Sequence, residues 1–472
     1  MTDTKHIEAF KAILGKKAVI TEPETLKPHL EEWRGKFFGQ TDVMLMPPNS
    51  DTLAKAVKYC SDHDIKIVPQ GGNTGLVGGS LPGLGNDNEI LINTSRMSRV
   101  LHVDSHNMSI TAEAGCTVAQ LQAAAAEHAL LFPLSLASEG SCTVGGIIST
   151  NAGGVHVLRY GTTRTLTLGL EAVLPSGKTY SNLNAPKKDN TGYALDQLLI
   201  GAEGTLGIIT KATLKLTPAE IQKHTFWLAV NSPKRAVQLL GEARRASSDR
   251  VSVFEIMPQA GLEFVLKHIA GTRNPLTNEA PWYLLVEVAS GTFDTGLERS
   301  MLAWLESAIE AGSILDGAMA TSESQSKAFW RLRESISEAQ KHEGGSIKHD
   351  ISVPLAMLPE FIVETTYMLE QRFPACRVTP FGHVGDGNLH FNVMQPQDAK
   401  KELFLANWDA MNRLVHDQTM KFGGSISAEH GIGSLKKSEL ARTKPAAEIK
   451  AMQAIKNALD PKNIMNPNVL FL

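Results

Sequence analysis

The sequence predicts an α+β fold divided over more than one domain. Its strands come in runs: 89–94, 99–104 and 108–115 are short apolar stretches separated only by turn residues. Such runs favour an α+β fold over a doubly wound sheet. A chain of 472 residues exceeds what one hydrophobic core usually supports. Near Pro218 the pattern changes to strands alternating with longer amphipathic helices, so a second domain is expected from residue 219.

The first elements of the chain lead into a glycine-rich loop. The segment 50–64 predicts a helix with Ser50 or Asp51 as its N-cap. The apolar stretch 65–68 then predicts a buried strand, and 69–80 (PQGGNTGLVGGS) follows it with five glycines. Such a loop brings backbone N–H groups close to a ligand, as a diphosphate requires. Taken alone, the loop is also compatible with a flexible surface turn.

Two further glycine-rich segments, 138–154 and 198–218, have the same character. Three such segments together predict one long polar ligand lying across a domain. The common nucleotide motifs are absent. No GxGxxG follows a strand, and the Gly177-Lys178-Thr179 run lacks the first P-loop glycine because Ala172 stands there.

The composition excludes several classes of protein. A net charge of −3 gives no electrostatic basis for binding nucleic acid. No apolar run is long enough to span a membrane, and the N-terminal residues lack the apolar core of a signal peptide. The four cysteines form no CxxC pair, as expected for reduced thiols. We therefore expect a cytoplasmic protein that neither binds nucleic acid nor is integral to a membrane.

The sharpest local signal is 382–393 (GHVGDGNLHFNV). Strict alternation in 388–393 places the apolar residues on one face of a strand and His390 on the other. The Gly-Asp-Gly turn before this strand can fold His383 back towards His390, and two converging histidines suit a metal ion. The alternative is that both are ordinary surface or hydrogen-bonded histidines.

A second polar stretch, 427–433 (SAEHGIG), offers a further ligand and a base. Glu429 would complete a donor set of two imidazoles and one carboxylate, which leaves open positions on a divalent cation as catalysis requires. His430 beside it would act as a general base. The HExxH pattern of metalloproteases is absent. A polar loop between glycines is the alternative interpretation.

Residues 330–348 carry side chains that suit a substrate with carboxylates. Arg333 and Ser337 lie one turn apart on a predicted helix, and Lys348 precedes a predicted strand. An arginine holds a carboxylate by a bidentate fork. The alternative is a solvated helix with ordinary charges.

Taken together, these motifs resemble the FAD-linked dehydrogenases of the vanillyl-alcohol oxidase/p-cresol methylhydroxylase superfamily, and within it the D-2-hydroxyacid branch. The resemblance covers nearly the whole chain and includes the terminal run 460–467 (DPKNIMNP). It implies a two-subdomain FAD-binding domain of the p-cresol methylhydroxylase type at 1–218 and a substrate-binding domain at 219–420. The latter would have an antiparallel sheet flanked by helices. A small helical C-terminal part at 421–472 would complete the active site.

The resemblance implies non-covalent FAD, because members with covalent flavin often carry a histidine in the first loop, where this sequence has Asn73. The residues that match the cofactor-binding motifs are Pro69, Gly71, Gly72, Asn73, Thr74, Gly75, Gly78, Gly79, Ser80, Ser138, Gly140, Thr143, Gly145, Gly146, Ser149, Asn151, Gly153, Gly154, Glu203, Gly204, Gly207, Ile208, Ile209 and Asn466.

The resemblance also implies roles for the polar residues of the second half. The expected ligands of a divalent metal, zinc or a similar ion, are His383, His390 and Glu429, with His430 as the base. The expected substrate-binding residues are Arg333, Ser337, Lys348 and Asn392. Ser337 stands where a threonine is typical. Lactate-type members tend to lack a lysine at the place of Lys348, so its presence favours a diacid.

The expected function is FAD-dependent oxidation of a D-2-hydroxyacid by metal-assisted proton abstraction and hydride transfer to flavin, with D-2-hydroxyglutarate as the favoured substrate. D-lactate and D-malate remain alternatives with the same chemistry. A flavin-free metal hydrolase and a non-enzymatic flavin-binding protein are more distant alternatives. The expected partners are the hydroxyacid and an unidentified electron acceptor, either an electron-transfer flavoprotein or a quinone. The habit of the family suggests a homodimer.

Overall fold

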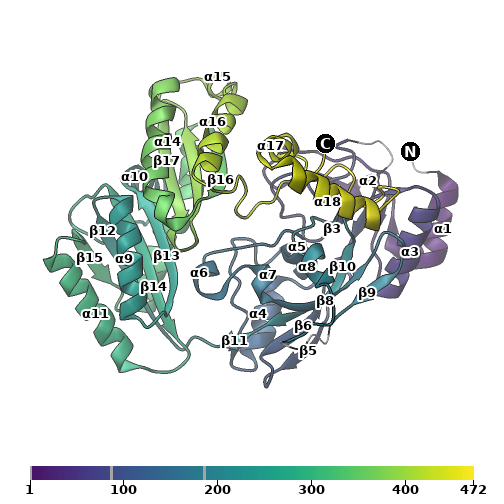
Figure 1. Ribbon diagram of the computed structural model, residues 1–472, viewed down its shortest axis with the longest axis horizontal. Helices are drawn as coiled ribbons and strands as arrows, with labels where there is room; N and C mark the ends of the chain where they lie inside the picture. Colours follow the sequence, from purple (N-terminus) through teal and green to yellow (C-terminus); the bar gives the residue numbers. More distant parts are fainter. Residues whose placement is uncertain (1–2, 86–88, 184–185, 187) are drawn as a thin grey trace. The chain divides into compact units, whose positions relative to one another are not determined.

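Residues 3–85, 89–183, 186 and 188–472 are described by the computed structural model (Figure 1). The chain divides into two units. The first unit combines Met1–Gly154, Gly161–Ala219 and Glu429–Leu472, and the second combines Val155–Tyr160 with Glu220–Ala428.

The observed division differs from the three parts expected from the sequence. The second unit begins at Glu220, close to the expected boundary, but it continues through 421–428. These residues stay with it because Ser425 exchanges two backbone hydrogen bonds with Ser352. Residues 429–472 belong to the first unit, where the N–H of Ile67 donates to the carbonyl of Ile464. The C-terminal part is therefore not a separate segment.

The first unit contains two principal sheets and one two-stranded ribbon. In the first sheet β2, β4 and β3 run parallel and β1 is antiparallel to β2. The second sheet is antiparallel, with the order β5-β6-β10-β8-β9. The strands are β1 (Val19–Ile20), β2 (Met44–Leu45), β3 (Lys66–Gln70), β4 (Glu89–Asn93), β5 (Val100–Asp104), β6 (Ser109–Glu113), β7 (Leu130–Leu131), β8 (Thr167–Val173), β9 (Thr179–Ser181), β10 (Ile208–Lys215) and β11 (Thr217–Pro218).

The helices of the first unit follow the capping signals of the sequence, with one correction. The N-cap of α3 is Asn49, whose side chain accepts from the N–H of Thr52, so Ser50 is already helical. Thr117 forms the N-terminal capping box of α4. The helices are α1 (Thr4–Leu14), η1 (Lys16–Ala18), α2 (Pro23–Leu30), α3 (Ser50–Asp62), α4 (Val118–Ala126), α5 (Val144–Ser149), α7 (Thr163–Leu166), α8 (Leu195–Leu199), α17 (Lys437–Thr443) and α18 (Ala446–Leu459).

The second unit is built on a seven-stranded antiparallel sheet with the order β15-β12-β14-β13-β17-β18-β16. Alternation along β12 sends Phe226 and Leu228 to one core cluster and Trp227 and Ala229 to another, so both faces of the sheet are covered. The strands are β12 (Gln222–Val230), β13 (Val251–Pro258), β14 (Trp282–Ser290), β15 (Asp316–Met319), β16 (Ser346–Ser352), β17 (Arg377–His383) and β18 (Asn388–Met394).

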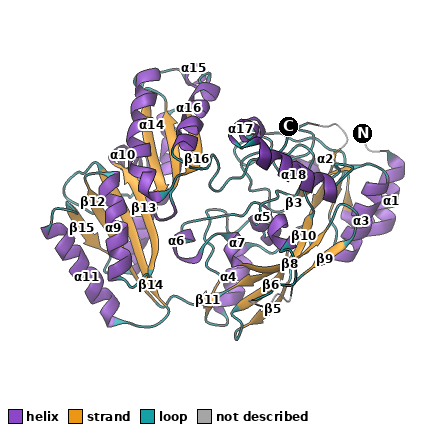
Figure 2. Cartoon of the chain, in the orientation of Figure 1, coloured by secondary structure: helices purple, strands orange, loops and turns teal. Residues whose placement is uncertain are grey.

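Helices cover the two faces of this sheet (Figure 2). Residues of α9, α11, α14 and α16 pack into one core cluster, and residues of α10, α12 and α13 pack into the other. The helices are α6 (Val157–Tyr160), α9 (Pro233–Ala246), α10 (Gln259–His268), α11 (Thr295–Glu310), α12 (Glu323–Glu334), α13 (Ile336–Ala339), η2 (Gln340–Glu343), η3 (Leu355–Met357), α14 (Leu358–Arg372), η4 (Val384–Asp386), α15 (Lys401–Leu405) and α16 (Trp408–Lys421).

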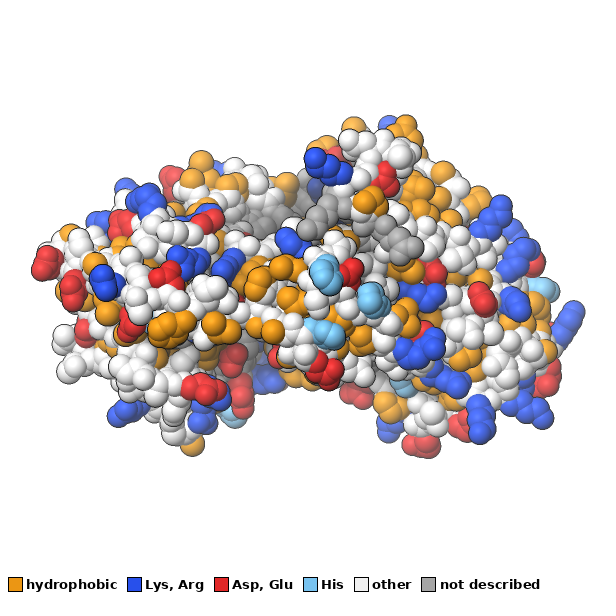
Figure 3. Space-filling view, turned by 90° about the horizontal axis from the view of Figure 1, so that it is seen from below, with side chains coloured by type: hydrophobic (Ala, Val, Ile, Leu, Met, Phe, Trp, Pro, Cys, Tyr) orange, Lys and Arg blue, Asp and Glu red, His pale blue; other side chains and the backbone are white. Residues whose placement is uncertain are grey.

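The surface agrees with the near-neutral composition. On the face drawn in Figure 3, Lys and Arg side chains are interspersed with Asp and Glu side chains. Within the described ranges, no helix combines the length and apolar character that crossing a membrane requires. The four cysteines are buried free thiols.

Candidate active site

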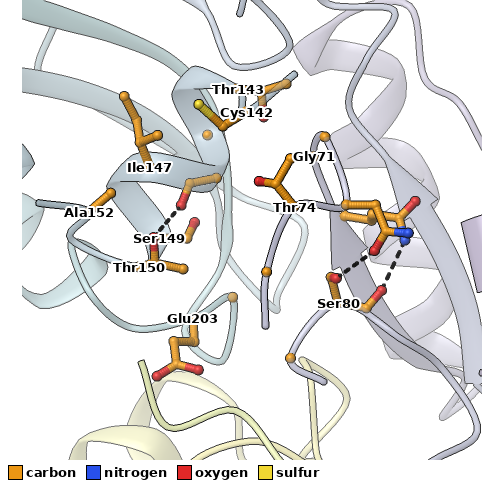
Figure 4. Close-up of a pocket in the computed structure, with 18 of the residues that line it drawn as sticks. Gly71, Thr74, Ser80, Cys142, Thr143, Ile147, Ser149, Thr150, Ala152 and Glu203 are labelled. Carbon is orange, nitrogen blue, oxygen red and sulfur yellow. Dashed lines mark hydrogen bonds between the residues drawn. The ribbon is translucent and has the colours of Figure 1, made fainter. Parts of the chain in front are cut away.

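A cavity in the first unit lies between the three glycine-rich segments (Figure 4). Its volume is about 290 Å³, near the lower end for small-molecule sites. The predicted cofactor-binding residues that line it are Pro69, Gly71, Gly72, Asn73, Thr74, Gly75, Gly79, Ser80, Ser138, Thr143, Gly145, Gly146, Ser149, Gly153, Glu203, Gly204, Gly207, Ile208 and Ile209. Outside this lining are the predicted residues Gly78, Gly140, Asn151, Gly154 and Asn466.

Close approach of the first two segments explains their small residues. A Cβ on Gly71 would lie 2.2 Å from Oγ1 of Thr143, and one on Gly72 would lie 1.9 Å from the carbonyl oxygen of Ser141. Any larger residue would separate the segments. The buried hydroxyl of Thr143 has no hydrogen-bond partner among the described residues, so a polar ligand in the cavity would satisfy it. The small residues and the unpartnered hydroxyl of this lining suit the chemistry of an extended polar ligand such as FAD.

The third segment fastens the C-terminal chain to the cavity wall. Glu203 accepts hydrogen bonds from the N–H of Ile432 at 2.8 Å and of Gly433 at 2.7 Å. Burial raises the pKa of Glu203, although these two N–H groups oppose the rise. Asn466 donates to the carbonyls of Gly79 and Glu203. Asn466 therefore links the loop of Gly79 to the loop of Glu203 without lining the cavity itself.

Several cavity residues were not predicted to bind the cofactor. Cys142, Ile147 and Thr150 also line it, and all three lie within the second glycine-rich segment, so the segment itself was the available signal. Glu429 and His430, expected as a metal ligand and a base, line the same cavity. Both residues therefore lie at the wall of the cavity that the glycine-rich segments form.

In the second unit, one face of the sheet gathers the polar residues predicted to act on substrate. Lys348 on β16 is paired with Asn392 on β18, and His390 is paired with Phe381 on β17. The intervening apolar residues of β18 are fully buried in the core on the opposite face. The predicted alternation of 388–393 is confirmed.

The hairpin between β17 and β18 brings His383 and His390 together. The chain turns through η4, with Gly387 in the left-handed conformation. The two imidazole rings meet edge to face with centroids 5.5 Å apart, and their potential ligand atoms lie within 4.8 Å of each other. The predicted convergence is confirmed, and the donor set suits a transition-metal ion.

Glu255 on β13 joins two of the predicted residues and was not itself predicted. Its Oε1 lies 2.5 Å from Nδ1 of His383, and its Oε2 accepts from Nε and Nη2 of Arg333, each at 2.7 Å. Burial alone would raise the pKa of Glu255, but His383 and Arg333 outweigh burial and hold it at about 2. The arginine edge expected to bind substrate therefore faces a protein carboxylate.

The remaining substrate-binding candidates differ in their surroundings. Asn392 is buried and donates to Oε1 of Gln340 at 2.8 Å. Ser337 is exposed on α13, whereas Arg333 is buried on α12. The structure thus brings Arg333, the two histidines, Lys348 and Asn392 to one face of the sheet and leaves Ser337 exposed.

Comparison with known proteins identifies the family. Residues 41–181 match the FAD binding domain, and residues 222–470 match the C-terminal domain of FAD linked oxidases. A D-2-hydroxyglutarate dehydrogenase of Xanthomonas citri pv. viticola is 36% identical over 100% of this chain and 98% of its own length. The mitochondrial D-2-hydroxyglutarate dehydrogenase of Arabidopsis thaliana is 36% identical over 98% of this chain and 81% of its own.

Other relatives broaden the comparison. A mitochondrial Schizosaccharomyces pombe protein whose name proposes a D-lactate dehydrogenase is 36% identical over 98% of this chain and 89% of its own. The solved p-cresol methylhydroxylase superposes with a TM-score of 0.75 at 17% identity, covering 98% of this chain and 96% of that enzyme. Alkyldihydroxyacetonephosphate synthase superposes with a TM-score of 0.74 at 17% identity, covering 99% and 85%.

These matches confirm the predicted p-cresol methylhydroxylase-type α+β fold. The chain belongs to the FAD-linked oxidases. Within that family it lies in the branch of FAD-dependent D-2-hydroxyacid dehydrogenases.

Proposed function

We propose that the protein oxidises D-2-hydroxyglutarate to 2-oxoglutarate. The observation that carries this proposal is that Arg333 and Lys348 share one sheet face with the His383–His390 pair. A diacid has a distal carboxylate that can pair with a second cation, whereas a monoacid such as lactate has none. Relatives named as D-2-hydroxyglutarate dehydrogenases support the same substrate.

FAD bound non-covalently in the cavity of the first unit would supply the acceptor for the α-hydride of the substrate. The glycine-rich segments would hold it through backbone N–H groups, and the hydroxyl of Thr143 offers a further polar contact. The side chain of Asn73 donates a hydrogen bond to the carbonyl of Glu31 and accepts one from the hydroxyl of Ser80. It therefore shapes the loop without offering a nucleophile to the flavin.

A divalent metal, with zinc the expected ion, would be held by His383, His390 and Glu429. A metal bound there would lower the pKa of the substrate hydroxyl. The two imidazoles converge within the second unit. Glu429 follows Ala428, whose N–H lies 3.4 Å from the carbonyl of Asp350, a residue paired with His390.

The remaining steps belong to this chain's own side chains. The imidazole of His430 takes the hydroxyl proton, so the substrate loses one proton and one hydride in becoming the 2-oxoacid. Lys348 and the free side of Arg333 hold the distal carboxylate, which orients the α-carbon. Asn392, fixed by Gln340, donates or accepts at the reacting end.

The test is a visible spectrum of the purified protein before and after anaerobic addition of D-2-hydroxyglutarate, with D-lactate and D-malate in parallel. Bleaching of the flavin band by D-2-hydroxyglutarate at the lowest concentration supports the proposal. Preferential bleaching by D-lactate, which the Schizosaccharomyces pombe relative makes the second candidate, contradicts the diacid assignment. Metal analysis of the same sample tests the zinc assignment separately.

The reduced flavin must pass its electrons onward, and we propose an electron-transfer flavoprotein or a quinone as the acceptor. A homodimer and a cytoplasmic location stay predictions. A flavin-free metal hydrolase has lost its support, because the FAD-binding domain is matched over residues 41–181.

A further inference from the structure

Glu255 is the one carboxylate among the described residues for which contacts to both His383 and Arg333 are seen. It lies in the interior of β13, directly across from His383 in the antiparallel register, and its side chain is fully buried. Such a group is costly to bury unless both oxygens are satisfied. Here one oxygen contacts the imidazole of His383 and the other the guanidinium of Arg333. The two contacts together offset the cost of burying the carboxylate.

The contact with His383 decides which ring nitrogen is available. A carboxylate at 2.5 Å from Nδ1 keeps the imidazole proton on Nδ1. The lone pair of a neutral ring then lies on Nε2, the nitrogen through which an imidazole in this tautomer binds a metal ion. Carboxylates that receive the second N–H of a metal-binding histidine fix its orientation and raise its basicity.

The contact with Arg333 decides which side of the guanidinium is available. Nε and Nη2 both donate to Oε2 of Glu255, and the group also lies 4.9 Å from the ring centroid of Phe381. The bidentate edge is therefore occupied, and Nη1 is the nitrogen left to meet a substrate carboxylate. The charge of Glu255 also offsets that of Arg333, so Lys348 carries more of the attraction for a diacid.

We propose that Glu255 is a positioning residue that orients the metal-binding nitrogen of His383 and the substrate-facing side of Arg333 together. The inference rests on the proposed function, because it assigns a metal to the histidine pair and a carboxylate substrate to the arginine. It adds that one buried carboxylate aligns the two sites.

The test compares Glu255→Gln with Glu343→Gln as a matched control. Glu343 is a half-buried carboxylate of the second unit that likewise bridges a histidine, His268, and an arginine, Arg377, yet it belongs to no proposed site. The readouts are Zn²⁺ affinity by competition with a chelator, FAD content and the kinetics with D-2-hydroxyglutarate. We expect Glu255→Gln to weaken Zn²⁺ binding about 10–100-fold and to raise KM, with FAD content unchanged.

The control separates positioning from general stability. Glu343→Gln should keep Zn²⁺ affinity and KM within about 2-fold of the wild type, because it changes a similar contact outside the site. Equal Zn²⁺ affinity in Glu255→Gln and Glu343→Gln would overturn the proposal. A wild-type protein that binds no Zn²⁺ and keeps its flavin band with every hydroxyacid would contradict the proposed function instead.

A second measurement, of which ring nitrogen of His383 carries the proton, uses the wild-type protein and so does not depend on whether a Glu255 variant folds. In the metal-free wild-type protein labelled with ¹⁵N-histidine, the signals of His383 are identified by their loss in His383→Gln. We expect the protonated nitrogen to be Nδ1. A proton on Nε2 of His383 would overturn the inference, whatever the outcome of the metal titrations.

Discussion

Lys348 and Asn392 occupy directly opposite positions on β16 and β18, so an ammonium group and a carboxamide are neighbours on the face of the second unit's sheet that also carries His390. Directly opposite residues of an antiparallel pair have Cβ atoms about 5 Å apart. Both side chains can therefore contact a small ligand at once. This pairing leads to the first prediction, on substrate choice.

Lys348→Met should separate the diacid from the monoacid. The variant keeps the aliphatic stem and removes the charge, so it loses one charge-assisted hydrogen bond, worth about 1.5–3 kcal/mol. We expect kcat/KM for D-2-hydroxyglutarate to fall about 10–150-fold, and kcat/KM for D-lactate to change less than about 3-fold because lactate has no distal carboxylate. Steady-state kinetics with both acids measures the difference. Equal losses would remove Lys348 as the specificity residue.

His430→Ala should slow turnover strongly while the protein keeps its flavin. General base catalysis contributes about 10²–10⁴-fold, so kcat should fall by that factor. The flavin should remain because the glycine-rich loops that would hold it are unchanged. Absorbance of the purified variant measures FAD, and anaerobic bleaching measures the reductive step. His102→Ala, at an exposed position of β5, serves as the control. Retained turnover in His430→Ala would rule out this histidine as the base.

Glu203→Gln should loosen the C-terminal wall of the cavity. The amide can accept only one of the two N–H groups of Ile432 and Gly433, and its NH₂ then faces a donor. Losing a hydrogen bond to a charged group costs about 1.5–3 kcal/mol, so FAD affinity should fall about 10–150-fold. Glu113→Gln is the matched control, since Glu113 is a buried carboxylate of the same unit that also accepts a backbone N–H, that of Arg99. Equal FAD affinities in both variants would contradict this role.

The ionisation of Glu343 should make part of the free energy of unfolding depend on pH. Burial alone would raise the pKa of its carboxyl, but Lys267, Arg377 and His268 hold it at about 2, below the ordinary value of 4.5. Because the pKa of this carboxyl is lower in the folded than in the unfolded chain, its ionised form stabilises the fold at pH values above the unfolded pKa. That stabilisation is lost as the pH falls towards the folded pKa.

Glu343→Gln should therefore lower the free energy of unfolding near neutral pH by about 1–2 kcal/mol, and with it the melting temperature. The loss is modest because the lysine partner is solvent-exposed. The difference from the wild type should shrink as the pH falls from 4.5 towards 2. Thermal unfolding followed by circular dichroism across this range measures it. A difference that stays constant with pH would show that the ion pairs do not titrate as expected.

Much of the fold follows from patterns of short range. The alternation in 388–393 correctly separated the core residues from His390, because a strand has a fixed period of two. The glycine-rich segments were found because close backbone contacts tolerate no side chain, as at Gly72. The N-cap was displaced by one residue to Asn49, because Ser, Asp and Asn are all good caps and stand side by side.

Features that depend on distant parts of the chain were not predictable in this way. Glu255 stands in the apolar strand VSVFEIMP, where a lone carboxylate was the available signal, but its partners are 78 and 128 residues away in sequence. The exposure of Ser337 follows from how α13 packs. Periodicity along one helix cannot report that. The return of the C-terminal chain to β3 likewise depends on tertiary packing.

The first unit is discontinuous in the chain, and this has a consequence for biosynthesis. The isolated bridge between Ile67 and Met465 and the buried contact of Lys456 with the carbonyl of Thr205 form only after nearly the whole polypeptide has been made. The inserted stretch Glu220–Ala428 leaves the ribosome before residues 429–472 and has its own sheet and core. Because domains fold as units during synthesis, we expect the nascent chain to complete the second unit before the first, and a chain that ends before Lys456 to lack both of these contacts of the first unit.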